Sequence, residues 1–151
     1  MIKIKNINSS IPYMYFLRCY ETALKKNQKS INAINISSYN KKDDEVLSRY
    51  VNLKYIIDQQ WIFFSNYNSR KALDFLSHNQ ISVSIYWDTI GVQIRIKAKI
   101  DKTTNSFSDE HFNNRSLEKN ALAISSNQSN IIRSYEDVIK NYQETIGAKE
   151  V

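Results

Sequence analysis

Two neighbouring segments with strict alternation constrain the fold of this chain most. Residues 81–87 and 92–100 both alternate apolar side chains with polar or small ones. A period of two is typical of a β-strand that buries one face. The link between them, Asp-Thr-Ile-Gly at 88–91, is short enough for a tight turn, so the two segments predict an antiparallel hairpin. A chain with such a hairpin must place at least one sheet face against a core.

Other segments extend this sheet and add helices around it. Further strands are expected at 31–37, 46–57 and 61–65, with a polar loop at 38–45 and a short hairpin connection at 58–60. Apolar residues at helical spacing predict helices at 12–26, for about ten residues from Ser69, and at 108–115, 117–125 and 134–145. Ala72, Leu73 and Leu76 would form the apolar stripe of the second helix. Antiparallel strands with helices inserted between them predict a barrel-like α+β fold.

Length and composition narrow the class of protein. The 151 residues suggest a single domain over 1–151, with a helix at 12–26, a barrel core at 31–101 and a helical region at 105–146. One cysteine, Cys19, excludes an intrachain disulfide, and the two histidines lack metal-ligand spacing. No run has the apolar length of a signal peptide or a membrane span. These observations predict a cytoplasmic protein with no membrane partner and no metal.

The net charge of +6 favours anionic partners. The positive charges are spread mostly singly along the chain, and no nucleic-acid recognition motif accompanies them, so a nucleic-acid partner is not expected. A solvated basic surface would explain the same charge. Acidic lipid and phosphorylated small molecules are the other anionic partners that a basic chain attracts.

The segment 49–71 contains the residues best suited to bind a phosphate. Ser69-Arg70-Lys71 opens a predicted helix, where backbone N–H groups and the helix dipole favour an anion and two side chains add full positive charges. Arg49 and Lys54 lie on one predicted strand, but their offset of five places them on opposite faces unless a bulge or twist intervenes. The alternative is that Arg70 and Lys71 are ordinary exposed helix residues.

Five ordered motifs resemble the pyridoxamine 5'-phosphate oxidase family. WIFFSNYNSRKA at 61–72 is similar to that family's F-[YF]-[ST]-N-x-x-S-R-K-[AG] signature, and RYVNLK at 49–54 to its R-x-V-x-L-K strand. YWDTIGVQIRI at 86–96, HFNNRS at 111–116 and SSNQS at 125–129 follow in the family's order and with nearly its spacing. The resemblance covers most of residues 31–135 and implies an antiparallel, Greek-key-like split β-barrel that forms a homodimer, with FMN at the subunit interface.

Carried over by position, the resemblance assigns residues to the cofactor and the substrate. Arg49, Arg70 and Lys71 would hold the FMN phosphate. Phe64 and Ser65 would lie along the flavin, and Lys54 would lie between flavin and substrate. The predicted FMN-binding residues are Arg49, Lys54, Phe64, Ser65, Ser69, Arg70, Lys71, Gln93, Gln128 and Ser129. The predicted substrate-binding residues are Lys54, His111, Arg115 and Lys119. Gln93 could instead be a solvent-facing strand residue, and Gln128 and Ser129 a loop between helices.

The departures from the family pattern lie mostly on the substrate side. His111 stands where the family has tyrosine, Lys119 where it has serine, and Val92 replaces the arginine before Gln93. The family's C-terminal segment, which carries further flavin and substrate contacts, has no counterpart before Val151. We therefore expect an FMN-dependent oxidoreductase acting on another small substrate. The alternatives are a non-catalytic FMN-binding dimeric module and a genuine pyridoxamine/pyridoxine phosphate oxidase of vitamin B6 metabolism; the sequence identifies neither substrate nor electron acceptor.

Overall fold

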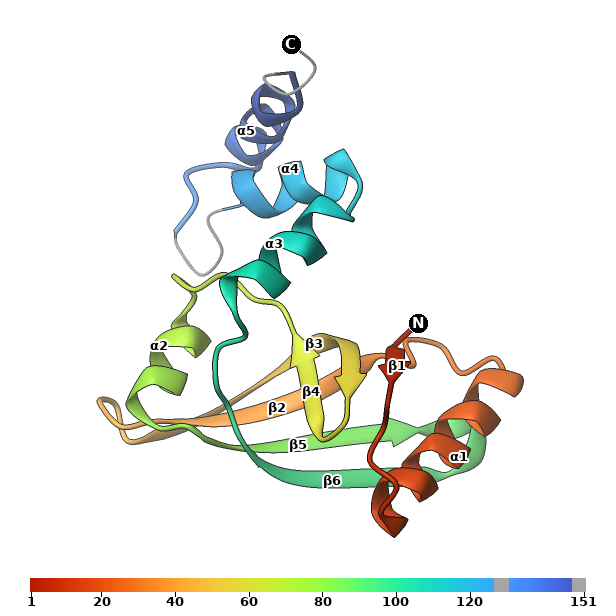
Figure 1. Ribbon diagram of the computed structural model, residues 1–151. Helices are drawn as coiled ribbons and strands as arrows, with labels where there is room; N and C mark the ends of the chain where they lie inside the picture. The colour runs from red at the N-terminus through yellow and green to blue at the C-terminus, as the bar shows by residue number, and fades with distance from the viewer. Residues whose placement is uncertain (127–130, 148–151) are drawn as a thin grey trace. The chain divides into compact units, whose positions relative to one another are not determined.

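The computed structural model describes residues 1–126 and 131–147 (Figure 1). The strands are β1 (Lys3–Lys5), β2 (Ala33–Asn40), β3 (Glu45–Ile57), β4 (Gln60–Phe63), β5 (Gln80–Trp87) and β6 (Val92–Lys99). The helices are α1 (Ile11–Lys25), α2 (Arg70–Ser77), α3 (Asn105–Asn113), α4 (Leu117–Ser125) and α5 (Tyr135–Gly147), with a short turn of helix η1 (Asp88–Ile90).

The long strand β3 connects all parts of the sheet. Its first part, Glu45–Asn52, pairs with β2 in an antiparallel register. Its last residues pair with β1 in parallel and with β4 in an antiparallel register. The strand order is β1-β3-β2-β5-β6, with β4 pairing β3 off this path. A strand that changes partners along its length lets one sheet curve around a core, as a split barrel requires.

A bulge lies at the point where β3 changes partners. Leu53 pairs with Phe63, and Tyr55 pairs with the adjacent Ile62, so Lys54 is the extra residue. A bulge of this kind shifts the alternation of the strand and increases its twist. Leu53 and Ile56 are consequently both fully buried although they are three positions apart.

The core lies between this sheet and α1. Phe16 on α1 packs against Trp61 and Trp87, with ring centroids 4.6 and 5.6 Å apart. The indole N–H of Trp87 donates a hydrogen bond to the Ile31 carbonyl at 3.2 Å, so the buried ring has its polar group satisfied. Cys19, on α1, is buried in the same core.

Contacts divide the chain into two compact units. The first comprises Met1–Ser65 with Asp74–Ile100 and holds the whole sheet. The second comprises residues 66–73 and the described residues from 101 onward. Within it α4 packs against α5, and the predicted start of α5 is confirmed, since the Asp137 N–H donates to the Ser134 hydroxyl at 3.1 Å. The expectation of one single domain stays a prediction.

The structure confirms the α+β fold and corrects several details. The sheet is mixed rather than antiparallel throughout, because the unpredicted strand β1 pairs in parallel with β3. Residues 38–40, expected in a loop, continue β2, whereas Phe64 and Ser65 lie beyond the end of β4. The predicted apolar stripe of α2 was wrong: Leu73 and Leu76 are exposed, and the buried residue of this helix is Asp74. No described helix is both long and apolar enough to cross a membrane.

The aromatic contact between α1 and the sheet gives a first prediction. Phe16→Ala should lower the free energy of unfolding by about 3 to 5 kcal/mol, because it leaves a cavity beside two tryptophans. Urea denaturation followed by tryptophan fluorescence measures this change. Tyr15→Ala, at an exposed position on the same helix, is the matched control and should cost less than about 1 kcal/mol. Similar losses in the two variants would contradict this view of the core.

Candidate functional site

Arg49 is the best-defined member of the predicted phosphate site. Its Nη1 donates to the Ser38 hydroxyl at 2.6 Å and to the Ile36 carbonyl at 3.5 Å. Its Nη2 donates to Asp74 Oδ2 at 3.3 Å, forming an ion pair. The Ser38 hydroxyl in turn donates to the same Asp74 oxygen at 3.1 Å. The three side chains therefore close a hydrogen-bonded triangle that links β2, β3 and α2.

Burial makes this triangle electrostatically strong. The Asp74 side chain is 2% exposed and that of Arg49 is 20% exposed. Burial lowers the pKa of Arg49 below its ordinary value, and the neighbouring carboxylate of Asp74 opposes that shift. The reference pKa of arginine is so high that the guanidinium keeps its charge under physiological conditions. The positive charge of Arg49 and the negative charge of the Asp74 carboxylate stabilise each other in this ion pair.

The guanidinium retains capacity for another acceptor. Arginine has five N–H donors, and Arg49 makes three hydrogen bonds. Its other N–H groups have no partner within residues 1–126 and 131–147. A phosphate or carboxylate oxygen is the acceptor that such a partly buried guanidinium favours.

The second half of β3 contains Lys54, and two further predicted residues, Phe64 and Ser65, lie just beyond the end of β4. All three are half-buried. Lys54 occupies the bulge, so the five-residue offset from Arg49 no longer determines that the two lie on opposite faces, which is the exception that the sequence left open. The Phe64 ring meets the Tyr55 ring edge-on at 6.2 Å.

The start of α2 is organised by polar side chains. Ser69 is fully buried and its hydroxyl donates to the Asn66 carbonyl at 2.7 Å, while the Asn66 side chain accepts from the Asn68 N–H at 2.8 Å. The Ser69 carbonyl accepts from the N–H groups of residues 72 and 73. These bonds fix the turn that precedes α2, which begins at Arg70. Arg70 is exposed and Lys71 is half-buried.

Gln93 is exposed on β6 and faces a cavity of about 360 Å³ on the sheet. Tyr50 and Tyr86, both largely exposed, also line this cavity. Trp87, which follows Tyr86, is 1% exposed and belongs to the core. The remaining lining residues are Lys29, Ser30, Ala33, Asn35, Ser84 and Ile85.

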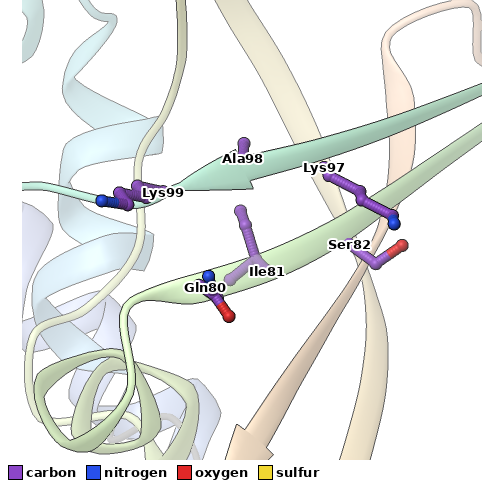
Figure 2. A pocket seen from close by; sticks show the side chains of 6 residues that line it. All are labelled: Gln80, Ile81, Ser82, Lys97, Ala98 and Lys99. Carbon is purple, nitrogen blue, oxygen red and sulfur yellow. The ribbon is translucent and has the colours of Figure 1, made fainter.

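A second, larger cavity of about 560 Å³ lies farther along the same hairpin. Figure 2 shows its lining side chains, Gln80, Ile81 and Ser82 from β5 and Lys97, Ala98 and Lys99 from β6. Ser82 and Lys97 are paired across the two strands. This cavity contains none of the residues predicted to bind FMN or substrate, and its lysines extend along an exposed strand.

Three of the predicted substrate residues lie in the second unit. His111, in α3, meets the Phe112 ring edge-on at 5.8 Å. The Arg115 guanidinium lies 5.0 Å from the centre of the Phe112 ring and donates to the Lys119 carbonyl at 2.9 Å. Arg115 is therefore held between two helices, and the Lys119 side chain is exposed. Gln128 and Ser129 lie outside the described residues.

Sequence reasoning missed two members of the site, Ser38 and Asp74. Ser38 was assigned to a loop, and Asp74 was not distinguished from other polar helix residues. The available signal was position: an aspartate in the middle of a short helix, four residues after Arg70, interrupts the apolar stripe. Among the described residues, no group of three or more His, Cys, Asp or Glu side chains could hold a metal ion.

The fold of this chain matches two solved structures. It matches the crystal structure of PhzG from Burkholderia lata in complex with tetrahydrophenazine-1-carboxylic acid, with a TM-score of 0.85 and 21% identity over 96% of this chain and 76% of that one. It also matches a pyridoxamine 5'-phosphate oxidase-related, FMN binding protein from Nostoc punctiforme, with a TM-score of 0.66 and 10% identity over 87% and 71% of the two chains. The expected split-barrel fold is thereby confirmed.

Sequence similarity identifies homologues of the chain. The chain is 33% identical over 133 residues to the pyridoxine/pyridoxamine 5'-phosphate oxidase of Nostoc sp., which covers 88% of this chain and 62% of that protein. It is 32% identical over 123 residues to the enzyme of the same name from Burkholderia lata, covering 82% and 57%. No protein-family model matches the chain. The chain is a homologue of the pyridoxine/pyridoxamine 5'-phosphate oxidases, as its motifs predicted, and spans about three fifths of their length.

The Arg49–Asp74 ion pair gives a second prediction. Arg49→Ala should lower the free energy of unfolding by about 3 kcal/mol, because it leaves the Asp74 carboxylate buried without its partner. Chemical denaturation measures this loss. The double variant Arg49→Ala/Asp74→Asn should recover part of it, since no charge is left buried.

Arg95→Ala, at an exposed position on β6, is the matched control and should change stability by less than about 0.5 kcal/mol. A loss in Arg49→Ala no greater than that in the control would mean that Asp74 does not depend on Arg49.

Proposed function

We propose that this protein binds FMN and acts as a flavin-dependent oxidoreductase on a small substrate other than pyridoxamine 5'-phosphate. The observation that carries the proposal is the similarity to pyridoxine/pyridoxamine 5'-phosphate oxidases over 133 residues. The match covers 133 of the 151 residues, so at most 18 residues at the two ends lie outside it. The segment 49–71, which contains the phosphate motifs, therefore lies within the match. The PhzG structure and the Nostoc punctiforme protein, described as FMN binding, support the same class.

The residues present suit the phosphate of FMN. Arg49 offers N–H donors beyond those used by Ser38, Ile36 and Asp74. Arg70 and Lys71 add two cations at the start of α2, where the helix dipole also favours an anion. A dianionic phosphate is stabilised most by several charge-assisted donors, which this set provides. We assign the phosphate to Arg49, Arg70 and Lys71, with Ser69 shaping the turn.

The flavin ring is assigned to residues around the bulge and on β6. Phe64 and Ser65 would contact the isoalloxazine, and Gln93 would donate to one of its polar edges. When bound, FMN supplies a ring that accepts a hydride from the substrate. Lys54, held at the bulge, would keep a positive charge beside the ring. Gln128 and Ser129 complete the proposed cofactor set.

The substrate residues argue for an anionic substrate. Arg115 is oriented by the Lys119 carbonyl and the Phe112 ring and keeps further N–H donors for a carboxylate or phosphate. Lys54, His111 and Lys119 are the other proposed substrate contacts. His111 in place of the family's tyrosine changes both the shape and the proton chemistry of this position, which supports a substrate different from pyridoxamine phosphate.

Two alternatives remain, each favoured by a specific observation. The changed substrate residues favour a non-catalytic FMN-binding module, and the names of the relatives favour genuine pyridoxine/pyridoxamine 5'-phosphate oxidase activity. In each case we propose a cytoplasmic homodimer with FMN at the subunit interface. The exposed side chains of Tyr50 and Tyr86 on the sheet are suited to cover by a second copy.

Flavin binding gives the third prediction. The purified protein should be yellow, with absorption maxima at about 370 and 450 nm. If it is purified as apoprotein, these maxima should appear when FMN is added. Arg70→Ala should abolish retention of FMN through gel filtration, because it removes a full charge from the phosphate site. Arg133→Ala, an exposed arginine, is the control and should retain flavin. A wild-type protein that takes up no FMN would refute the proposal.

Turnover assays separate the three functions. Reduction of the bound flavin by pyridoxamine 5'-phosphate, followed by reoxidation with oxygen, would identify the genuine oxidase. Reduction only by other small anionic substrates would support the main proposal. Flavin that stays oxidised with every organic reductant tested, although the protein binds it tightly, would indicate the non-catalytic module.

A further inference from the structure

Asp74 is a buried charge to which neither the family motifs nor the proposed function assign a role. Its carboxylate is nearly inaccessible, and among the described residues its side chain bonds only to Ser38 and Arg49. A buried carboxylate repels a nearby phosphate, so its presence beside the proposed phosphate site calls for a compensating role. Its contacts show what that is.

The carboxylate and the Ser38 hydroxyl restrain the guanidinium of Arg49 from two sides. Ser38 fixes Nη1 at 2.6 Å and Asp74 fixes Nη2 at 3.3 Å, while a hydrogen bond between Ser38 and Asp74 locks the two restraints together. Hydrogen bonds to both terminal nitrogens restrict the rotation of the planar guanidinium. The direction of its other N–H donors is therefore set before any ligand arrives, and such preorganisation strengthens binding.

We propose that Asp74 is a positioning residue for the FMN phosphate, acting with Ser38 to hold Arg49 so that its remaining N–H donors face the phosphate. This inference rests on the proposed function and deepens it. Asp74 lies on the same helix as Arg70 and Lys71 and follows Arg70 by one turn.

The test compares FMN with riboflavin, which has the same ring and no phosphate. Both flavins are titrated into apoprotein, and dissociation constants are obtained from the quenching of flavin fluorescence. Asp74→Ala should weaken FMN binding about tenfold, as expected when one charge-assisted hydrogen bond is misplaced, and should leave riboflavin binding unchanged. Asp74→Asn, which keeps an acceptor for Arg49, should remain within about threefold of wild type for FMN. Asp109→Ala, at an exposed position in α3, is the matched control.

Each result decides the question. Equal weakening of FMN and riboflavin would make Asp74 a purely structural residue and overturn the inference. Unchanged or tighter FMN binding in Asp74→Ala would make the carboxylate a competing charge and would also overturn it. A wild-type protein that binds neither flavin would refute the proposed function itself. If Asp74→Ala does not fold, Ser38→Ala takes its place, and an unchanged preference for FMN over riboflavin in that variant overturns the inference.

Discussion

The structure depends on one strand that serves two sets of partners. β3 pairs with β2 over its first part and with β1 and β4 over its last residues, and the bulge at Lys54 marks the change. Without the bulge, strict alternation would turn either Leu53 or Ile56 out of the core. The same irregularity separates the two residues of the strand that are predicted to bind FMN. Arg49 lies where β3 pairs with β2, and Lys54 lies where β3 pairs with β4.

At Arg49, stability and the proposed phosphate binding would depend on the same atoms. The guanidinium compensates the buried carboxylate of Asp74, and in the proposed function it also binds a phosphate. An isolated buried carboxylate is costly, so this region cannot lose the arginine without losing part of its folding free energy. Loss of flavin binding after a change at Arg49 is therefore ambiguous, whereas changes at the exposed Arg70 report on binding more directly.

The sequence was informative where its patterns were periodic and where motifs were long. The hairpin of β5 and β6, helix α1 and the start of α5 were predicted because the period of a strand or helix is a local property of the sequence. The short strand β1 escaped because three residues carry no measurable period. The partnership of Ser38 and Asp74 escaped because it joins residues 36 positions apart, and only the folded sheet brings them together. Motif similarity identified Arg49 but could not reveal what holds it.

The hairpin that first suggested the fold has one more consequence. β6 lies at one end of the strand order, and its exposed face presents Arg95, Lys97 and Lys99 in alternation. An edge strand offers unpaired backbone groups to any similar strand it meets, and repeated cationic side chains oppose such encounters by mutual repulsion. The row of charges thus acts as a safeguard against strand-to-strand aggregation while the chain is newly made. It explains part of the basic character of the protein without reference to any ligand.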